Sequence, residues 1–291
     1  MLDMSEVADN IETSKVKYRR PLNKQQVRTL HLLYWYRFCT ARQLAHSFKK
    51  PSPKAIQNKL QILEKQQLIG KRYDKSYRLV GRPAEYYITP KGARALEKAQ
   101  PNTTNQWVTK SLYKNKTVSD DFLKHTIAVT DASQRFRAIY GDKVVILTKC
   151  YMVQFDYYPT WTPDLHIKIL AKGETPTKHY FVDMWDGTKP FFVSVRKTRN
   201  YVNFKESSDW DDDEQFPAML AICETTQLQG KLNRQMKRIL NDTWHDELIF
   251  ATTTRQLLTE ATKPTDKIWS RIDVDDTPEL TTLRALIPLT S

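Results

Sequence analysis

The chain has 291 residues and a formal net charge of +13. This length allows two domains with separate cores, because a domain usually takes about 100 to 200 residues. Three widely spaced cysteines exclude a disulfide framework and a zinc knuckle, and no apolar run approaches the roughly 20 residues that cross a bilayer. We therefore expect a cytoplasmic protein without a membrane partner.

The positive charge is concentrated in the first third of the chain. Residues 1–100 contain 21 Lys and Arg against 8 Asp and Glu, whereas the remaining residues contain 25 of each kind. A basic domain beside a neutral one predicts that the first meets a polyanion and that the second has another task. Residues 1–20 are expected to form a flexible N-terminus.

Helical periodicity begins after Asn23, a suitable N-cap, and a second short helix can be capped by Thr40. A third apolar repeat at helical spacing follows. The pattern then changes to two strands joined by a basic loop within residues 70–89, and residues 90–99 return to helix. Three helices, a two-stranded basic wing and a closing helix predict a winged helix-turn-helix over residues 21–100.

In a helix-turn-helix, the second helix of the pair lies in the major groove and its first residues meet base edges. The polar side of the corresponding helix in this sequence carries Lys54, Gln57, Asn58 and Gln61. Gln and Asn can pair bidentately with adenine, and Lys can reach guanine or phosphate. Phosphate contacts from the wing are predicted for Lys71, Arg72, Lys75, Arg78 and Arg82. Winged helices also bind proteins, but the concentrated charge favours double-stranded DNA as the partner.

Residues 101–118 are rich in Asn, Thr, Ser and Lys without sustained periodicity, which predicts a linker. The second domain is then expected to cover residues 119–291. It begins with a helix that Ser119 can cap. For His125 on this helix, we expect a buried or capping role rather than a place in a site.

The second domain has the pattern of a mixed α/β fold. Strand-like runs occupy residues 143–149, 150–155, 164–170, 178–185, 217–225 and 246–254. Helices are expected over residues 189–204 and 226–240. Because the late strands alternate with helices, they should pair in parallel through crossover connections. The predicted fold class is therefore α+β or α/β, with a winged helix followed by a mixed α/β domain.

Two acids mark a candidate site in this domain. Asp164 follows a proline in "TPDLHIKI", and Asp183 stands inside "YFVDMW", which is the pattern of PD-(D/E)xK nucleases. There, two carboxylates bind Mg²⁺ and a lysine helps to position the attacking water. Asp164 and Asp183 would be the metal ligands and Lys197 the catalytic lysine. The lysine expected two residues after Asp183 is replaced by Trp185, so we expect a domain without nuclease activity and without a cofactor.

The chain resembles the replication-relaxation family, in which a winged helix precedes a nuclease-like domain. The resemblance rests on "RPAEYYITPKG", "HTIAVTD", "TPDLHIKI", "YFVDMWDGTKP" and "VRKTRNYVNF". The fourth stretch usually contains a glutamate, a second acid or similar polar residue, and then Arg-Gly-Thr. Asp183, Trp185 and Asp186 stand at the first three of these positions, whereas Lys197 and Tyr201 match the family's later lysine and tyrosine.

The resemblance implies a DNA-binding accessory protein of a plasmid or integrative conjugative element, active in replication or transfer. The expected partners are a relaxase, a helicase or a replication initiator, and the second domain is expected to serve homodimerisation or partner docking. Two alternatives remain open, an Mg²⁺-dependent PD-(D/E)xK endonuclease and a winged-helix regulator of transcription or copy number. The acidic run from Asp209 to Glu214 is expected to be a solvated loop.

Overall fold

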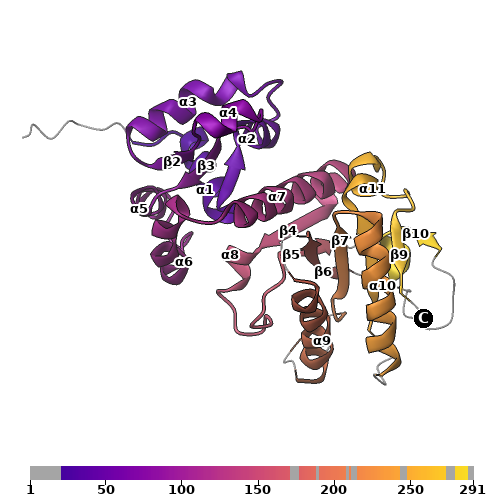
Figure 1. The fold of residues 1–291 in the computed structure, drawn as a ribbon. Coiled ribbons are helices and arrows are strands. Elements are labelled where there is room, and N and C mark those ends of the chain that lie inside the picture. Colours follow the sequence, from indigo (N-terminus) through magenta and orange to yellow (C-terminus); the bar gives the residue numbers. More distant parts are fainter. Residues whose placement is uncertain are drawn as a thin grey trace, which may run out of the picture.

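The computed structural model describes residues 21–170, 177–187, 190–207, 210, 215–242, 248–272 and 279–287. The expected flexible N-terminus lies outside these residues, as does the acidic run 209–214 except for Trp210. Two separate sheets organise this part of the chain, and helix α7 (Asp120–Tyr140) lies between them (Figure 1). The chain is a mixed assembly of helices and sheets, as expected.

The first unit contains the predicted helices and strands in the predicted order. Its elements are α1 (Lys24–Tyr36), β1 (Phe38–Thr40), α2 (Ala41–Ser47), α3 (Lys54–Lys65), β2 (Ile69–Arg72), α4 (Lys75–Leu79), β3 (Glu85–Ile88) and α5 (Pro90–Ala99). In the described residues the strands form a three-stranded antiparallel sheet in the order β1-β3-β2. Two short elements were not predicted, the strand β1 and the helix α4, which replaces part of the basic loop in the wing.

Local signals explain where these elements begin. Asn23 and Thr40 each form a capping box with the glutamine three residues later, which confirms both predicted caps. Gly92 in the first turn of α5 closely approaches the residue before β2, because a Cβ atom there would lie 2.0 Å from the carbonyl oxygen of Leu68. Only glycine fits against this backbone atom.

The segment 101–118, interpreted as a linker from its composition, contains α6 (Gln106–Ser111) and the 3₁₀ helix η1 (Leu112–Lys116). Leu112 is buried in the core of the first unit, and the N–H of Asn105 donates to the hydroxyl of Tyr34 at 2.6 Å. This segment therefore packs against the first unit, whereas the position of the domain boundary stays a prediction.

The second sheet has seven strands in the described part of the chain, in the order β10-β9-β8-β7-β6-β5-β4. They are β4 (Val144–Thr148), β5 (Leu165–Ile169), β6 (Lys178–Trp185), β7 (Ala218–Cys223), β8 (Phe250–Thr254), β9 (Trp269–Arg271) and β10 (Leu280–Thr281). The first three strands form an antiparallel meander, and β6, β7 and β8 pair in parallel. The predicted parallel crossovers are confirmed, with α9 (Phe191–Ser207) and α10 (Thr226–Asn241) as the connecting helices.

Each face of this sheet has its own core. Val182 and Met184 of β6 pack on the side of α7, together with Phe136. Phe181 and Trp185 pack on the opposite side, in the core that contains residues of α9 and α10. Strand alternation thus divides the β6 side chains between two helical layers. No helix of the described residues is long and apolar enough to cross a membrane.

The strand predicted over residues 150–155 is wrong. Its first three residues belong to the helical turn α8 (Lys149–Met152), and β4 pairs directly with β5. Tyr151, Val153 and Phe155 are 36 to 47% exposed, so the alternating apolar pattern does not cover a sheet face.

Helix α7 is the main contact between the two units. The hydroxyls of Tyr36 and Ser133 lie 2.5 Å apart, and Gln43 Nε2 donates to Asp131 Oδ1 at 2.7 Å. The first unit therefore rests on the same helix that covers one face of the second sheet (Figure 1).

Candidate functional site

Asp164 and Asp183 face each other across the β5–β6 pair. Leu165 pairs with Val182, so Asp164, directly before β5, lies beside Asp183 on β6. The N–H of Asp164 donates to Asp183 Oδ1 at 3.3 Å, and the N–H of Met184 donates to Asp164 Oδ2 at 2.9 Å. Both carboxylates are buried. The antiparallel register therefore brings together the two acids selected from the sequence.

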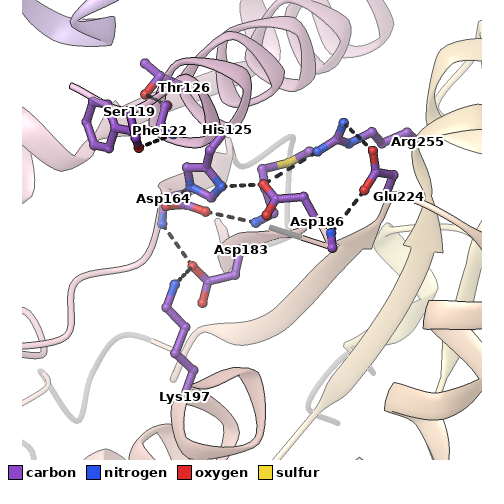
Figure 2. A network of polar contacts seen from close by, with 12 residues as sticks. Ser119, Phe122, His125, Thr126, Asp164, Asp183, Asp186, Lys197, Glu224 and Arg255 are labelled. Carbon is purple, nitrogen blue, oxygen red and sulfur yellow. Dashed lines mark hydrogen bonds and ion pairs between the residues drawn. The ribbon is translucent and has the colours of Figure 1, made fainter. Parts of the chain in front are cut away.

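Lys197 extends from α9 to Asp183 (Figure 2). Its Nζ atom lies 2.5 Å from Asp183 Oδ1, and 19% of its side chain is exposed. Burial on its own would lower the pKa of Lys197, but the charges of Asp183 and Asp164 outweigh this effect and raise the pKa. The ammonium group is therefore charged at neutral pH and acts as the counter-ion of Asp183.

His125 of α7 bridges two carboxylates. The residue is buried, as expected, but the sequence did not predict its place in the site. Its Nε2 atom lies 3.1 Å from Asp164 Oδ1, and its Nδ1 atom lies 2.8 Å from Asp186 Oδ2. A neutral imidazole carries one N–H and an imidazolium carries two. The ring can therefore donate to both carboxylates at once only when both of its nitrogens carry a proton.

Asp186, Glu224 and Arg255 follow the carboxyl ends of the parallel strands β6, β7 and β8. Arg255 lies 3.7 Å from Asp186 Oδ2 through Nη2 and 3.8 Å from Glu224 Oε1 through Nη1. The N–H of Gly187 donates to Glu224 Oε2 at 3.0 Å. Because the carboxyl ends of parallel strands meet at one edge of a sheet, these side chains extend the acid pair along that edge (Figure 2).

The charges of this network set the protonation of Asp164. Burial alone would raise the pKa of this carboxyl, but the charge of Lys197 and the hydrogen bond from His125 hold the pKa well below its usual range. Asp164 is therefore ionised at neutral pH. Three buried acids, Asp164, Asp183 and Asp186, thus face the cationic side chains of Lys197 and Arg255 and the ring of His125.

The arrangement does not fit a magnesium site. Mg²⁺ needs oxygen ligands in near-octahedral geometry. Both oxygens of Asp164 accept hydrogen bonds, and Asp183 Oδ1 accepts from Lys197. Of these four oxygens, Asp183 Oδ2 is buried without a hydrogen-bond partner. In the described part of the chain, no group of three or more His, Cys, Asp or Glu is placed to hold a metal ion.

Trp185 stands where the nuclease pattern would have its lysine. Its side chain is 3% exposed and belongs to the same core as Tyr201 and Met219. It lies on the same face of β6 as Asp183, as strand alternation predicts. An indole ring cannot supply an ammonium group, and in this site the ammonium comes from Lys197 on α9 instead.

The sequence model of the family described as Replication-relaxation matches residues 30–219, which is more than half of the chain. The chain belongs to the replication-relaxation family. Its family description links the protein to replication. The matched segment includes His125, Asp164, Asp183 and Lys197, whereas Arg255 follows it.

Other comparisons add little to the family assignment. No curated protein matches the chain significantly. Two solved structures of Lactococcus lactis ZitR, a cysteine-to-serine mutant and a double mutant, are each 21% identical to this chain in sequence. Their TM-scores are 0.25 and 0.24. They cover 38% and 35% of this chain, and 73% and 66% of their own chains. At these TM-scores the likeness carries no argument.

Most residues that the sequence assigned to DNA are exposed in this member of the replication-relaxation family. The exposed ones are Lys54, Gln57, Asn58, Gln61, Lys71, Lys75 and Arg78. The first four lie on α3 and the others on or beside the wing. Lys71 also lies 3.3 Å from Glu64. Their contacts with DNA stay a prediction.

Arg72 and Arg82 already have partners within the protein. Arg72 donates to the carbonyl oxygen of Val118 at 2.7 Å and lies 3.5 Å from Asp120. Arg82 lies 2.9 Å from Glu85 and 3.2 Å from Asp120. The phosphate contacts predicted for these two arginines would require at least the pairs with Asp120 to open.

Asp186, Glu224 and Arg255 were not selected from the sequence. Asp186 and Glu224 each directly follow a buried strand, and Arg255 directly follows β8. Polar residues in that position are a usable signal, because ligands and active sites of parallel sheets lie at the strand carboxyl ends. The signal for His125 was its place in "HTIAVTD", one of the stretches that carry the family resemblance.

Proposed function

We propose that this chain is a DNA-binding accessory protein of a mobile element, acting in its replication or transfer. The observation that carries this proposal is the agreement of charge with exposure in the first unit. The basic excess of the chain lies within residues 1–100, and the polar side of α3 is exposed. In this proposal the first unit is a winged helix that places α3 in the major groove of double-stranded DNA.

The second unit is proposed to be a nuclease-like scaffold that does not cleave DNA. Its antiparallel meander, crossover helix and parallel strand support the likeness to PD-(D/E)xK nucleases, as does the pairing of Asp164 with Asp183. Its acids are paired with side chains of the protein itself, chiefly Lys197 and His125. In this proposal the scaffold mediates dimerisation or binds a relaxase, a helicase or a replication initiator.

The test uses the full chain and supercoiled plasmid, with EDTA, Mg²⁺ or Mn²⁺ in parallel. Mobility shift and nicking are measured in the same samples. The proposal expects a shift in all three conditions and no nicking in any of them. A chain that leaves the plasmid unshifted at low salt would contradict the DNA-binding function, because phosphate contacts are strongest there.

A second candidate function is a metal-dependent endonuclease. It is favoured by the convergence of Asp164, Asp183 and Lys197 and by the unpartnered Oδ2 of Asp183. Such an enzyme would bind the metal through Asp164 and Asp183 and would use Lys197 to position the attacking water. Nicking that needs Mg²⁺ or Mn²⁺, and that is lost in both Asp164→Ala and Asp183→Ala, would establish this activity and overturn the proposal of an inactive scaffold.

A further inference from the structure

A wide basic groove lies between the first unit and the last turns of α7. It encloses about 1490 Å³ and is lined by parts of α1, the end of α2, the end of α5 and the C-terminal part of α7. The cations that line it are Lys24, Arg28, Lys49, Lys50 and Arg137. Among its described lining residues, Asp142 is the sole carboxylate. None of the residues assigned to duplex DNA lines this groove.

The cations of the groove are available to a ligand. The side chains of all five are exposed, and the ion pairs found in the described residues involve none of them. Arg28 donates to the carbonyl oxygen of Ser47 at 3.0 Å, which fixes its position without neutralising its charge. Like charges around a concave surface focus the electrostatic potential and attract a polyanion.

The groove also offers an aromatic surface. His31 and Trp35 lie one turn apart on α1, their ring centroids are 4.1 Å apart, and both line the groove. Burial lowers the pKa of His31, so its ring is mostly neutral at pH 7 and adds a flat surface more than a charge. Aromatic side chains within a basic groove are the usual platform for unpaired bases. The bases of a duplex are stacked inside and cannot use such a surface.

We propose that this groove binds single-stranded DNA, with its phosphates on the lysines and Arg137 and its bases on the His31–Trp35 pair. The chain would then hold a duplex through α3 and the wing, and a single strand through a separate surface. This inference goes beyond the proposed function, because the groove can bind a strand whether or not the winged helix reads a duplex.

The experiment measures fluorescence anisotropy of the full chain with a labelled oligo-dT of about 12 nucleotides, a length within the usual range of one single-strand site. The groove variant is Lys49→Glu with Lys50→Glu. Its matched control is Lys263→Glu with Lys267→Glu, an equal charge change at exposed positions outside the groove. The wing variant Lys75→Glu with Arg78→Glu is measured with both oligo-dT and duplex DNA.

The groove variant is expected to bind oligo-dT at least tenfold more weakly. The salt slope, which is the slope of the logarithm of affinity against the logarithm of salt concentration, should be smaller in magnitude by about 1.4, because two phosphate contacts are lost. The matched control and the wing variant should bind oligo-dT within about threefold of the wild type. For duplex DNA the opposite result is expected: the wing variant should bind more weakly, and the groove variant should bind nearly as well as the wild type. The single-strand proposal and the duplex proposal can therefore be contradicted independently of each other. Equal loss of oligo-dT binding in the groove variant and the matched control would overturn the proposal.

A second arm tests the aromatic surface with an abasic strand of the same length. This strand keeps the phosphates and lacks the bases, so it should bind about tenfold more weakly than oligo-dT. Equal binding of both strands would show a general anion surface and overturn the stacking of bases. If the groove variant fails to fold, Lys24→Glu with Arg137→Glu replaces it, since both side chains are exposed and lie on different elements.

Discussion

The guanidinium of Arg82, on the loop before β3, lies 3.2 Å from the carboxylate of Asp120 in the first turn of α7. Arg72 of β2 lies 3.5 Å from the same carboxylate. The helix that receives both arginines also carries His125, whose ring contacts Asp164. One helix therefore connects the wing to the buried charges of the second sheet.

Asp120→Asn is expected to raise affinity for duplex DNA by several-fold. Two arginines of the wing lose their shared counter-ion and become available to phosphates, which should also steepen the salt dependence. The side chain of Asp120 is 55% exposed, so the change in the free energy of unfolding should stay within about 1 kcal/mol. Anisotropy across a salt series and urea unfolding measure the two effects.

The neighbouring substitution Asp121→Asn serves as the control for Asp120→Asn. It removes the same charge from the same exposed turn of α7, but no ion pair of Asp121 is found among the described residues. Equal gains of affinity in both variants would mean that only net charge matters and that Arg72 and Arg82 do not reach the DNA.

Residues of α3 and of the wing should affect DNA binding in different ways. Lys75→Glu with Arg78→Glu is expected to weaken binding to all duplex sequences and to lower the salt slope by about 2, because both contacts are with phosphates. Gln57→Ala with Asn58→Ala should instead cost about 1–3 kcal/mol of discrimination between sequences for each lost base contact. Binding to a selected site and to random duplex separates the two effects.

These two pairs of substitutions also test the placement of α3 in the groove. All four side chains are exposed, so the fold should be retained. A chain in which neither pair changes the affinity or the sequence preference does not use this surface for DNA.

Lys197→Met is expected to destabilise the protein by about 3–5 kcal/mol. The substitution leaves the carboxylate of Asp183 buried without its counter-ion, which is more costly than removing a whole ion pair. The double variant Asp183→Asn with Lys197→Met should therefore be more stable than Lys197→Met alone. Urea unfolding at neutral pH measures both variants. Additive losses in the double variant would show that the two side chains are not coupled.

The lowered pKa of Asp164 predicts that the free energy of unfolding decreases at acid pH. Its pKa is lower in the folded chain than in the unfolded chain, where an aspartate has a pKa of about 3.9. Its contribution to stability is therefore fully present above that value and is lost as pH falls toward the folded pKa. Asp164→Asn should be clearly less stable than the wild type near neutral pH, with a gap that narrows below about pH 4.

Urea unfolding at several pH values measures this gap, and Asp156→Asn is the control because Asp156 is exposed on a loop. A gap between Asp164→Asn and the wild type that stays constant through the acid range would argue against a depressed pKa.

The sequence by itself determined most helices and strands of this protein. The caps at Asn23 and Thr40, the apolar repeats of α1 and α3, and the buried runs of β6 and β7 are local patterns, and each produced the predicted element. The reason is that backbone periodicity and capping depend on residues a few positions apart. The stretch after β4 was predicted wrongly as a strand, because its apolar residues alternate as they do in strands. In the structure these residues do not pair with the edge strand β4.

Only the tertiary structure decided how the charged residues are paired. The sequence selected Asp164, Asp183 and Lys197, but it placed neither His125 nor Arg255 beside them. These side chains come from α7, the residue before β5, β6, α9 and α11 (Arg255–Glu260), and they meet because the helices pack on the sheet in one particular way. The same packing pairs Arg82 with Asp120, a contact between residues 38 positions apart. Contacts of this kind depend on how distant elements pack, and no local pattern in the sequence records them.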